Sequence, residues 1–228
     1  MRLAVISDVH GSVRALESVL SAIEDDAPDL TVHGGDLVLN GPRPAEVIDL
    51  IRERGFPGVV GNTDELLWRP ELRADLDSRM PRLRRLLDVL FGPAASLTRE
   101  LLGAERMEWL QGLPQEWFSE DQSAAVLHAS PGDLWKPLLP DADDRAFADV
   151  YGEIPTSVAV YGHIHRPFVR ALSDITVANS GSVGMPYDGD PRASYLLIED
   201  RRARVKRVEY DVEGEVADLL SSAYPQAE

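Results

Sequence analysis

The chain has 228 residues, a length that suits one domain or one domain with a sizeable insertion. Its 44% hydrophobic and 27% charged residues are typical of a globular protein and argue against a disordered chain. With 39 acidic against 23 basic residues the net charge is −16, which disfavours binding to polymeric nucleic acid or to an anionic membrane. The sequence contains no cysteine, which excludes disulfides, zinc–cysteine sites, iron–sulfur clusters and thiol catalysis.

The first apolar run, Leu3 to Ile6, is too short for a signal peptide or for a membrane span, which needs about 20 apolar residues. We therefore expect a cytoplasmic protein without membrane association.

The first 62 residues alternate between strand and helix patterns. Short apolar runs predict strands at 3–6, 30–32 and 59–60. Apolar residues recur at helical spacing over 16–23, and a second helix is predicted at 44–54 with a proline in its first turn. This alternation with short connections predicts right-handed crossovers and a parallel sheet.

Between about residues 66 and 115 the pattern becomes helical. Leucines between 83 and 90 predict one amphipathic helix, and a second is expected from about 97 to 112 with an interruption near Gly103. No linker rich in Gly, Ser or Pro separates this stretch. We therefore predict a single domain over 1–228 with a helical insertion at about 66–115.

Six further strands are predicted in the second half of the chain. They are 124–127, 158–161, 168–172, 175–178, 195–198 and 205–210. The later ones lie close together without helices between them, which favours antiparallel pairing. A terminal helix is expected at 213–222.

Residues able to bind metal ions follow five of the predicted strands. They are Asp8 and His10, Asp36, Asn62, His128, and His163 with His165. Because ligands gather at the carboxyl ends of strands in open α/β sheets, these segments should deliver their side chains to one edge. Four imidazoles, two carboxylates and an amide are too many ligands for one tetrahedral zinc. They suit two divalent ions with Asp36 bridging, a pair that can activate water and clamp phosphoryl oxygens.

Each segment alone has a structural alternative. Asp8 could cap the helix that begins near Val13, and Asn62 with Glu65 resembles a helix capping pair. A histidine at a strand end is often only hydrogen-bonded. The conjunction favours metal binding, since four of the five histidines fall at predicted strand ends. The fifth, His33, lies within the second strand and is interpreted as structural.

The order Asp8-x-His10, Gly35-Asp36, Gly61-Asn62, His128 and Gly162-His163-x-His165 resembles the calcineurin-like metallophosphoesterase superfamily. The segments 179–184 and 191–195 resemble the C-terminal blocks of its small bacterial and archaeal phosphodiesterase-like branch. The match extends from Met1 to about Tyr210. The resemblance implies an α/β fold, a four-layer α/β/β/α sandwich with a helical insertion.

The resemblance also implies which residues share a metal ion. Asp8, His10 and His165 would hold one ion, Asn62, His128 and His163 the other, and Asp36 would bridge them. Imidazole and carboxylate ligands accept manganese, iron, nickel, zinc or cobalt, and manganese is our working expectation for these two divalent transition-metal ions. The expected catalytic residues are Asp36, Asn62, His128 and His163, with the last two near the charge that develops at phosphorus.

Three positions need separate interpretation. Thr63 stands where many superfamily members have a proton-donating histidine, and a threonine hydroxyl is a poor general acid. The phosphodiesterase-like branch commonly lacks that histidine, so Thr63 favours diester over monoester hydrolysis. Asp64 either orients a ligand histidine or is an acid in the first turn of a helix. Ser12 replaces a common asparagine and is expected to act as a helix N-cap.

Substrate-binding residues are less clearly marked. Four tryptophans could stack on a nucleobase but are more often part of the core: Trp68, Trp109, Trp117 and Trp135. An arginine-rich stretch is interpreted as a solvated helix face, with a phosphate-holding lid as the alternative. Its arginines are Arg69, Arg73, Arg79, Arg82, Arg84 and Arg85. Arg192, in a family-like segment, is a candidate for substrate binding or for structure.

The sequence thus predicts a metal-dependent phosphoesterase, and specifically a phosphodiesterase that hydrolyses small phosphate esters with a dimetal-activated hydroxide. The alternatives are a phosphomonoesterase, a phosphoprotein phosphatase or a dinucleoside polyphosphatase. A non-catalytic binding scaffold is disfavoured because all seven ligand positions keep ligand-capable residues. The negative net charge favours small-molecule substrates over polymeric ones. The sequence leaves open whether the protein forms a homo-oligomer.

Overall fold

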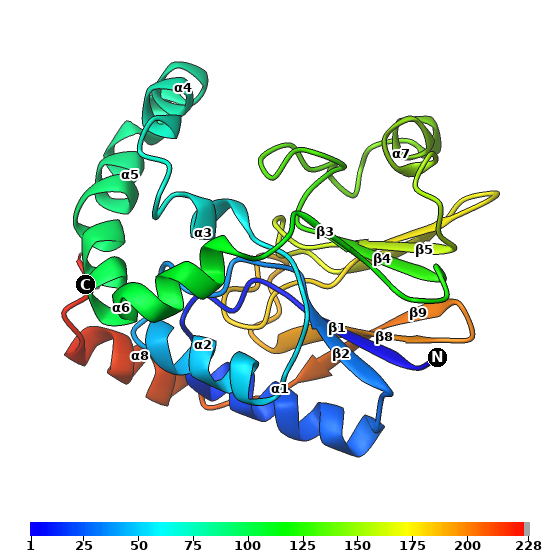
Figure 1. The fold of residues 1–228 in the computed structure, drawn as a ribbon, viewed down its shortest axis with the longest axis horizontal. Coiled ribbons are helices and arrows are strands. Elements are labelled where there is room, and N and C mark those ends of the chain that lie inside the picture. The colour runs from blue at the N-terminus through cyan, green and yellow to red at the C-terminus, as the bar shows by residue number, and fades with distance from the viewer. Residues whose placement is uncertain (226–228) are drawn as a thin grey trace.

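The computed structural model describes residues 1–225, which form two mixed β-sheets flanked by helices (Figure 1). The strands are β1 (Leu3–Ile6), β2 (Leu30–His33), β3 (Glu116–Phe118), β4 (Ala124–Leu127), β5 (Val158–Tyr161), β6 (Phe168–Ala171), β7 (Thr176–Asn179), β8 (Ala193–Glu199) and β9 (Arg202–Val208). The helices are α1 (Val13–Asp26), α2 (Pro44–Glu53), α3 (Asn62–Glu65), α4 (Leu72–Arg79), η1 (Pro81–Leu83), α5 (Arg84–Val89), η2 (Leu90–Ala94), α6 (Ala95–Gln111), α7 (Asp144–Tyr151) and α8 (Val212–Ser221).

The two sheets have the strand orders β2-β1-β8-β9 and β3-β4-β5-β7-β6. Antiparallel pairing of the later strands is confirmed for β6 with β7 and for β8 with β9. It is wrong for β5 and β7, which run parallel. After β5 the chain crosses to the sheet edge as β6 and returns as β7 in the next position, so β7 regains the direction of β5.

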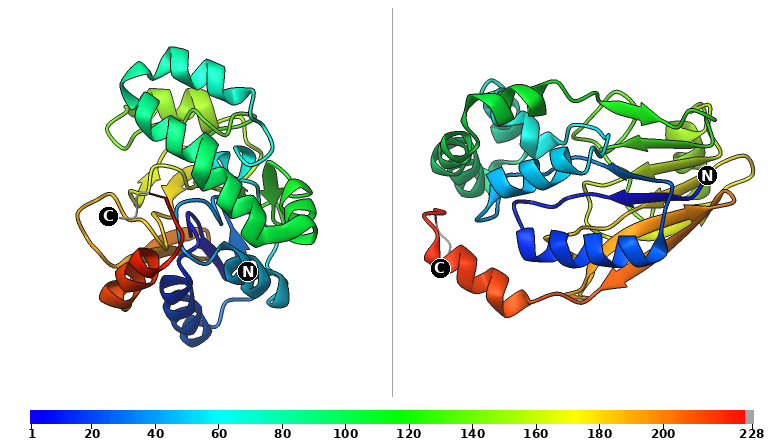
Figure 2. Two further views of the ribbon diagram at one scale, coloured as in Figure 1. Left: turned by 90° about the vertical axis from the view of Figure 1, so that its left-hand side faces the viewer. Right: turned by 60° about the horizontal axis from the view of Figure 1, so that its bottom comes forward.

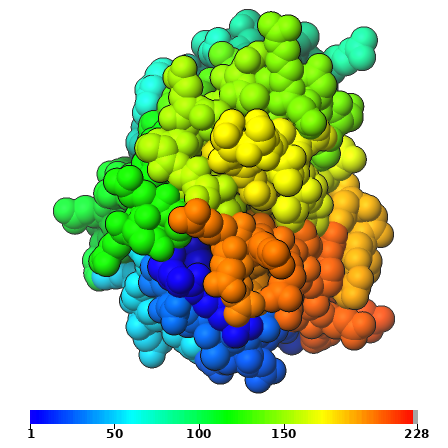
Figure 3. Space-filling model, turned by 90° about the vertical axis from the view of Figure 1, so that its right-hand side faces the viewer, coloured from blue at the N-terminus to red at the C-terminus, as the bar shows by residue number. Residues whose placement is uncertain are grey.

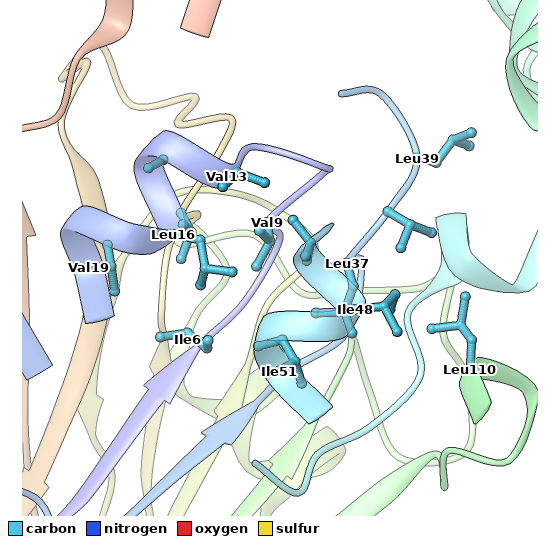
Figure 4. Close-up of a cluster of buried hydrophobic side chains, with 14 of the residues drawn as sticks. Ile6, Val9, Val13, Leu16, Val19, Leu37, Leu39, Ile48, Ile51 and Leu110 are labelled. Carbon is cyan, nitrogen blue, oxygen red and sulfur yellow. The ribbon is translucent and has the colours of Figure 1, made fainter. Parts of the chain in front are cut away.

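Three apolar layers hold the sheets and helices together, because side chains alternate between the faces of each strand. In β1, Leu3 and Val5 belong to the layer between the sheets, while Ile6 packs with the helices outside the first sheet. Figure 4 shows that outer layer, with Ile6 between Leu16 of α1 and Ile51 of α2. A third layer joins the second sheet to α7. The expected four-layer α/β/β/α sandwich is confirmed.

Two helices that are far apart in the sequence, α1 and α8, lie together on the outside of the first sheet. Figure 2 shows α1 and α8 side by side on the outside of the first sheet, where α1 contacts β8. Figure 3 views the side that carries the N-terminus, where the β8–β9 hairpin (orange) lies beside β6 and β7 (yellow). None of the helices within residues 1–225 is long and apolar enough to cross a membrane.

The helical segment 72–111 projects beyond the sheets (Figure 1). The helix predicted at 83–90 is a short α5 with a 3₁₀ turn before it and a π turn after it, since Pro93 and a non-helical Gly92 interrupt regular bonding. The interruption expected at Gly103 is present, with φ at 66° inside α6. The patterns did not predict α4, α7 or β3.

The strand predicted at 59–60 is wrong. The chain makes only an isolated bridge between Gly58 and His33 there. Val60 then donates to the carbonyl of Pro114 and not to β2, and Asn62 already begins α3. Pairing therefore stops as the chain turns toward the sheet edge.

Candidate metal centre

The structure gathers seven polar side chains from five segments at the carboxyl ends of β1, β2, β4 and β5 and at the start of α3. They are Asp8, His10, Asp36, Asn62, His128, His163 and His165, called the polar cluster below. All of them are buried except His163, which is half-buried. These are the seven residues that the sequence selected as candidate ligands.

Four members form one compact group. Ligand atoms of Asp8, His10, Asp36 and His165 all lie within 4.8 Å of one another. The Nε2 atom of His165 is 3.1 Å from Oδ1 of Asp8 and 3.2 Å from Nε2 of His10. A buried Asp/His group of this kind is a metal-binding arrangement.

The other three members form a second group beside the first. The Oδ1 atom of Asn62 is 2.7 Å from Nε2 of His128 and 2.6 Å from Nδ1 of His163. The two imidazole nitrogens are 3.1 Å apart. One amide oxygen and two ring nitrogens thus converge on a single point.

Asp36, a member of the first group, also faces the second. Its Oδ2 atom is 3.8 Å from Nε2 of His10 in the first group and 3.5 Å from Nε2 of His128 in the second. Its other oxygen, Oδ1, accepts a hydrogen bond from the backbone N–H of Thr63 at 2.8 Å. One oxygen is therefore fixed by the backbone while the other faces both groups.

Backbone carbonyls set the tautomers of three histidines. His10 donates from Nδ1 to Leu39 O at 2.7 Å, His128 to Gly34 O at 2.8 Å, and His165 to Met185 O at 2.5 Å. The lone pair of each ring is then on Nε2, which points into the cluster. Two such lone pairs face each other 3.2 Å apart, between His10 and His165. This repulsion is relieved by a cation, so the residues present fit divalent metal ions.

The charges in the cluster are consistent with that fit. Burial opposes ionisation of Asp8, but a proton on Nε2 of His165, through its charge and its hydrogen bond to Asp8, holds the pKa of the Asp8 carboxyl well below its usual range, and a bound cation would act on Asp8 in place of that proton. Burial, together with the neighbouring His128, lowers the pKa of His163 to about 4. An imidazole with that pKa is neutral at pH 7 and offers its lone pair to a metal.

Five of the seven cluster residues have a left-handed backbone, a conformation rarely adopted outside glycine. They are Asp8 (φ 56°), His10 (51°), Asp36 (53°), His163 (65°) and His165 (54°). Such a backbone costs on the order of 1–3 kcal/mol per residue and persists only where surrounding structure enforces it. Here Asp8 N donates to Gly35 O and His10 N to Asp36 O, each at 3.0 Å, which ties the first two loops together.

Two glycines of the sequence motifs are required by close approach of the chain to a carboxylate. A Cβ on Gly61 would lie 2.1 Å from Oδ1 of Asp36. A Cβ on Gly162 would lie 2.5 Å from Oδ2 of Asp8. Neither position can accept a side chain unless a cluster carboxylate moves.

Asp64 lies in the first turn of α3, and its carboxylate accepts from Gly61 N at 3.1 Å and from Leu37 N at 2.9 Å. Asp64 therefore joins the backbone of Leu37, the residue after Asp36, to the backbone of Gly61. Within residues 1–225, no hydrogen bond joins Asp64 to a histidine. Burial and the nearby charge of Asp36 raise the pKa of Asp64 to about 7. A cation at the cluster would favour the ionised form of Asp64.

The other positions singled out from the sequence have definite surroundings. Thr63 Oγ1 and Ser12 Oγ are buried without hydrogen-bond partners among the described residues, so Ser12 occupies the N-cap of α1 without capping through its side chain. His33 is fully buried, its ring centroid 6.1 Å from that of Trp109. Arg192 forms an ion pair with Asp190 at 2.7 Å on the surface.

The tryptophans and three of the six arginines of the helical stretch have structural partners. All four tryptophans are half-buried against the apolar layers, and Trp135 also donates from Nε1 to Glu65 at 3.0 Å. Arg69, Arg73 and Arg79 pair with nearby acids. The remaining arginines of the stretch, at 82, 84 and 85, are exposed.

The sequence did not single out the side chains that hold the Asp8 loop and the Gly162 loop. Ser182 donates from Oγ to Asp8 O at 2.7 Å, and Asn179 donates from Nδ2 to Gly162 O at 2.6 Å. Both belong to the family-like segment 179–184, which was the available signal. Tyr187, which stacks on His165, was also missed, and its only signal was an aromatic residue soon after that segment.

Comparison with known proteins defines the class. Residues 1–202 match the calcineurin-like phosphoesterase superfamily domain, so the chain belongs to that superfamily, and the predicted family is confirmed. The relatives place it in the small phosphodiesterase-like branch. It is a metallophosphoesterase with a buried Asp/His metal-site cluster.

Three relatives illustrate the similarity. The chain is 29% identical to the uncharacterized protein MJ0912 of Methanocaldococcus jannaschii, over 98% of this chain and 94% of that protein. It is 26% identical to phosphodiesterase YfcE of Escherichia coli, over 88% of each. The crystal structure of a metallophosphoesterase from Sphaerobacter thermophilus is 29% identical, with a TM-score of 0.77 over 100% of this chain and 96% of that one.

Proposed function

We propose that this protein is a dimetal phosphodiesterase that hydrolyses small phosphate esters. The observation that carries the proposal is the convergence of inward-facing imidazole lone pairs and two carboxylates at one buried point. The similarity to phosphodiesterase YfcE supports the same activity class. The net charge of −16 favours small esters over polyanions.

In this proposal the two groups of the polar cluster hold one ion each. Asp8, His10 and His165 hold the first, Asn62, His128 and His163 hold the second, and Asp36 contributes to both. When bound, two divalent ions polarise the phosphoryl group and lower the pKa of an attacking water. We take manganese as the working metal, because mixed nitrogen and oxygen ligands accept it.

The protein supplies orientation and charge. The backbone hydrogen bond from Thr63 N to Asp36 Oδ1 keeps the other Asp36 oxygen directed at both groups. His163 is the half-buried member of the cluster, so it lies where an ester would enter. Pre-oriented groups of this kind stabilise the charge that develops on the phosphoryl oxygens.

The test is hydrolysis of bis(4-nitrophenyl) phosphate by manganese-loaded protein. Asp36→Ala or His128→Ala should lower turnover at least about 100-fold, because even the outer partners of metal ligands are worth 10–100-fold. Metal analysis should show two ions per chain in the wild type and fewer in both variants. Asp149→Ala, an exposed acid on α7, is the matched control and should leave turnover and metal content unchanged. Unchanged turnover in both cluster variants would contradict the proposal.

The preference for diesters rests on Thr63. Its hydroxyl is a poor proton donor for an alkoxide leaving group, which is the difficult step in monoester hydrolysis. Thr63→His should raise activity on 4-nitrophenyl phosphate relative to the diester, by up to about 100-fold where the imidazole reaches the leaving oxygen. If the ratio of the two activities does not change, Thr63 does not determine the preference.

A further inference from the structure

The loop after the segment 179–184 places an aromatic ring directly against the polar cluster. The ring of Tyr187 stacks on the imidazole of His165, with centroids 4.4 Å apart and planes at 19°. The backbone N–H of Tyr187 donates to His165 O at 3.0 Å. Tyr187 is therefore held against His165 both by its ring and by its backbone.

Tyr187 is nevertheless 59% exposed, the most exposed large hydrophobic side chain among the described residues. An aromatic ring in a core is covered on both faces. Here His165 covers one face, and much of the rest of the side chain is open to solvent beside the cluster. An exposed ring at this place has no role in the apolar layers of the fold.

The loop that carries the ring is firmly held. Both backbone polar groups of Met185 are hydrogen-bonded. Its N–H donates to Ser182 Oγ at 2.8 Å, and its carbonyl accepts from Nδ1 of His165 at 2.5 Å. Further along, Arg207 pairs with Asp188 on the loop. A ring fixed before binding loses little entropy when a ligand stacks on it.

The surface beside the loop is apolar. A hollow of about 200 Å³ reaches His10 and Met185, and it is lined further by Tyr210, Val216 and Leu219. His10 is a cluster residue, and Met185 lies two positions before Tyr187. The hollow adjoins His10 and the exposed ring adjoins His165, and the centroids of these two imidazoles are 4.9 Å apart.

The tryptophans considered from the sequence do not offer an equivalent surface. Trp68, Trp109, Trp117 and Trp135 are half-buried against apolar layers, and Trp135 also has its indole N–H bound to Glu65. Tyr187 is the aromatic side chain that combines contact with the cluster and a largely open surface.

We propose that Tyr187 is a specificity-determining residue whose open surface stacks on an aromatic group of the ester, such as a nucleobase or a phenyl ring. This inference rests on the proposed phosphodiesterase function and narrows its substrate class to esters of aromatic-bearing alcohols. Stacking of a base on an aromatic side chain contributes about 1–3 kcal/mol, which corresponds to roughly 5- to 150-fold in affinity.

The test compares Tyr187→Leu and Tyr187→Phe with the wild type, all loaded with manganese. In calorimetric titrations, Tyr187→Leu should bind phenylphosphonate at least about 5-fold more weakly and methylphosphonate equally well. With bis(4-nitrophenyl) phosphate its KM should rise by a similar factor at unchanged kcat, since stacking acts on bound substrate and transition state alike. Tyr187→Phe should behave as the wild type. Phe118→Leu, at an exposed aromatic residue on β3, is the matched control.

Each other result has a definite meaning. Equal losses for phenylphosphonate and methylphosphonate, or a fall in kcat with loss of bound metal, would show that Tyr187 only supports His165, and would overturn the inference. Unchanged affinity for phenylphosphonate would overturn it as well. A wild type that binds phosphonates but hydrolyses no diester would overturn the proposed function, and the phosphonate titrations would still decide the role of Tyr187.

Discussion

The polar cluster and the helical segment 72–111 are built in opposite ways. The cluster is joined by contacts between residues far apart in the chain, such as His10 and His165, which are separated by 155 positions. In the helical segment, by contrast, Arg79 pairs with Asp75 at the surface and Arg73 with Asp77 in a half-buried position, each four residues away. The cluster consists of contacts between distant parts of the chain, whereas α4 carries ion pairs within single helical turns, and within the segment α6 adds packing on α2 and the Arg106–Asp49 pair.

This difference indicates which of the two regions tolerates amino-acid substitutions. The cluster combines burial, strained backbone and converging polar atoms, so small displacements there carry large costs. Exposed ion pairs are worth only about 0–1 kcal/mol each. Substitutions in the two regions should therefore differ in effect even when the chemical change is the same.

The largest effect is expected from adding one methyl group at the cluster. In Gly61→Ala the new Cβ would lie 2.1 Å from Oδ1 of Asp36, so the loop or the carboxylate must move. We expect loss of bound metal and a fall of about 3 kcal/mol in the free energy of unfolding. The matched control is Gly112→Ala after α6, where the closest atom to the new Cβ, Trp109 O, is at an ordinary 3.4 Å. Urea unfolding and metal analysis of both variants give the comparison, and equal behaviour would contradict it.

The second effect concerns His33 at the end of β2, whose ring centroid lies 6.1 Å from that of Trp109 in the helical segment. Burial lowers the pKa of His33 to about 4, against about 6.5 in an unfolded chain. Above pH 6.5 the ring is neutral in both states; as the pH falls toward 4, only the unfolded chain gains the proton. The free energy of unfolding should therefore fall by about 3 kcal/mol over this range. Urea unfolding at pH 7 and pH 4 should give a loss that is about 3 kcal/mol smaller in His33→Leu than in the wild type, because His163 and the other buried groups contribute equally in both proteins. Equal losses in both proteins would refute the assignment.

A smaller effect is expected at Asp64, which supports the chain beside Asp36. Asp64→Asn keeps the shape but turns one of the two acceptors into a donor facing a backbone N–H. We expect manganese affinity to fall about 10- to 100-fold, as for other partners of metal ligands. Asp77→Asn on α4, a half-buried acid of the helical segment, is the control, and titration of manganese into both variants is the measurement. Retained affinity in Asp64→Asn would mean that the Asp36 backbone does not need this support.

The smallest effect is expected from the exposed arginines of the helical segment. Replacing Arg82, Arg84 and Arg85 together by Ala should change the free energy of unfolding by less than about 0.5 kcal/mol and KM by less than about twofold. This outcome agrees with a solvated helix face. A rise of tenfold or more in KM for the diester at unchanged kcat would show instead that these guanidinium groups hold phosphate.

The sequence predicted the cluster better than the surrounding fold. Apolar runs followed by Gly and polar residues marked the ends of β1, β2, β4 and β5, and these ends do meet. The strand at 59–60 was predicted wrongly because a short apolar run does not reveal where pairing stops. The parallel pairing of β5 with β7 was missed because strand neighbours are not encoded by spacing alone.

The two interpretations of Asp64 illustrate the same limit. A helix-start acid and an orienting carboxylate have the same sequence signature. Folding places Leu37 N within 2.9 Å of the carboxylate, 27 positions away in the chain, and gives the acid a partner that local pattern cannot indicate.

The sequence by itself determined the composition of the site: which residues end the strands, that they can bind metals, and that glycine precedes three of them. These properties are local, since they follow from residue type and from the two-residue period of a strand. Only the tertiary structure decided the tautomers of the histidines, the position of Asp36 facing both groups and the stacking of Tyr187 on His165. Each of these depends on contacts between distant parts of the chain, and their geometry is set only when the sheets and helices pack.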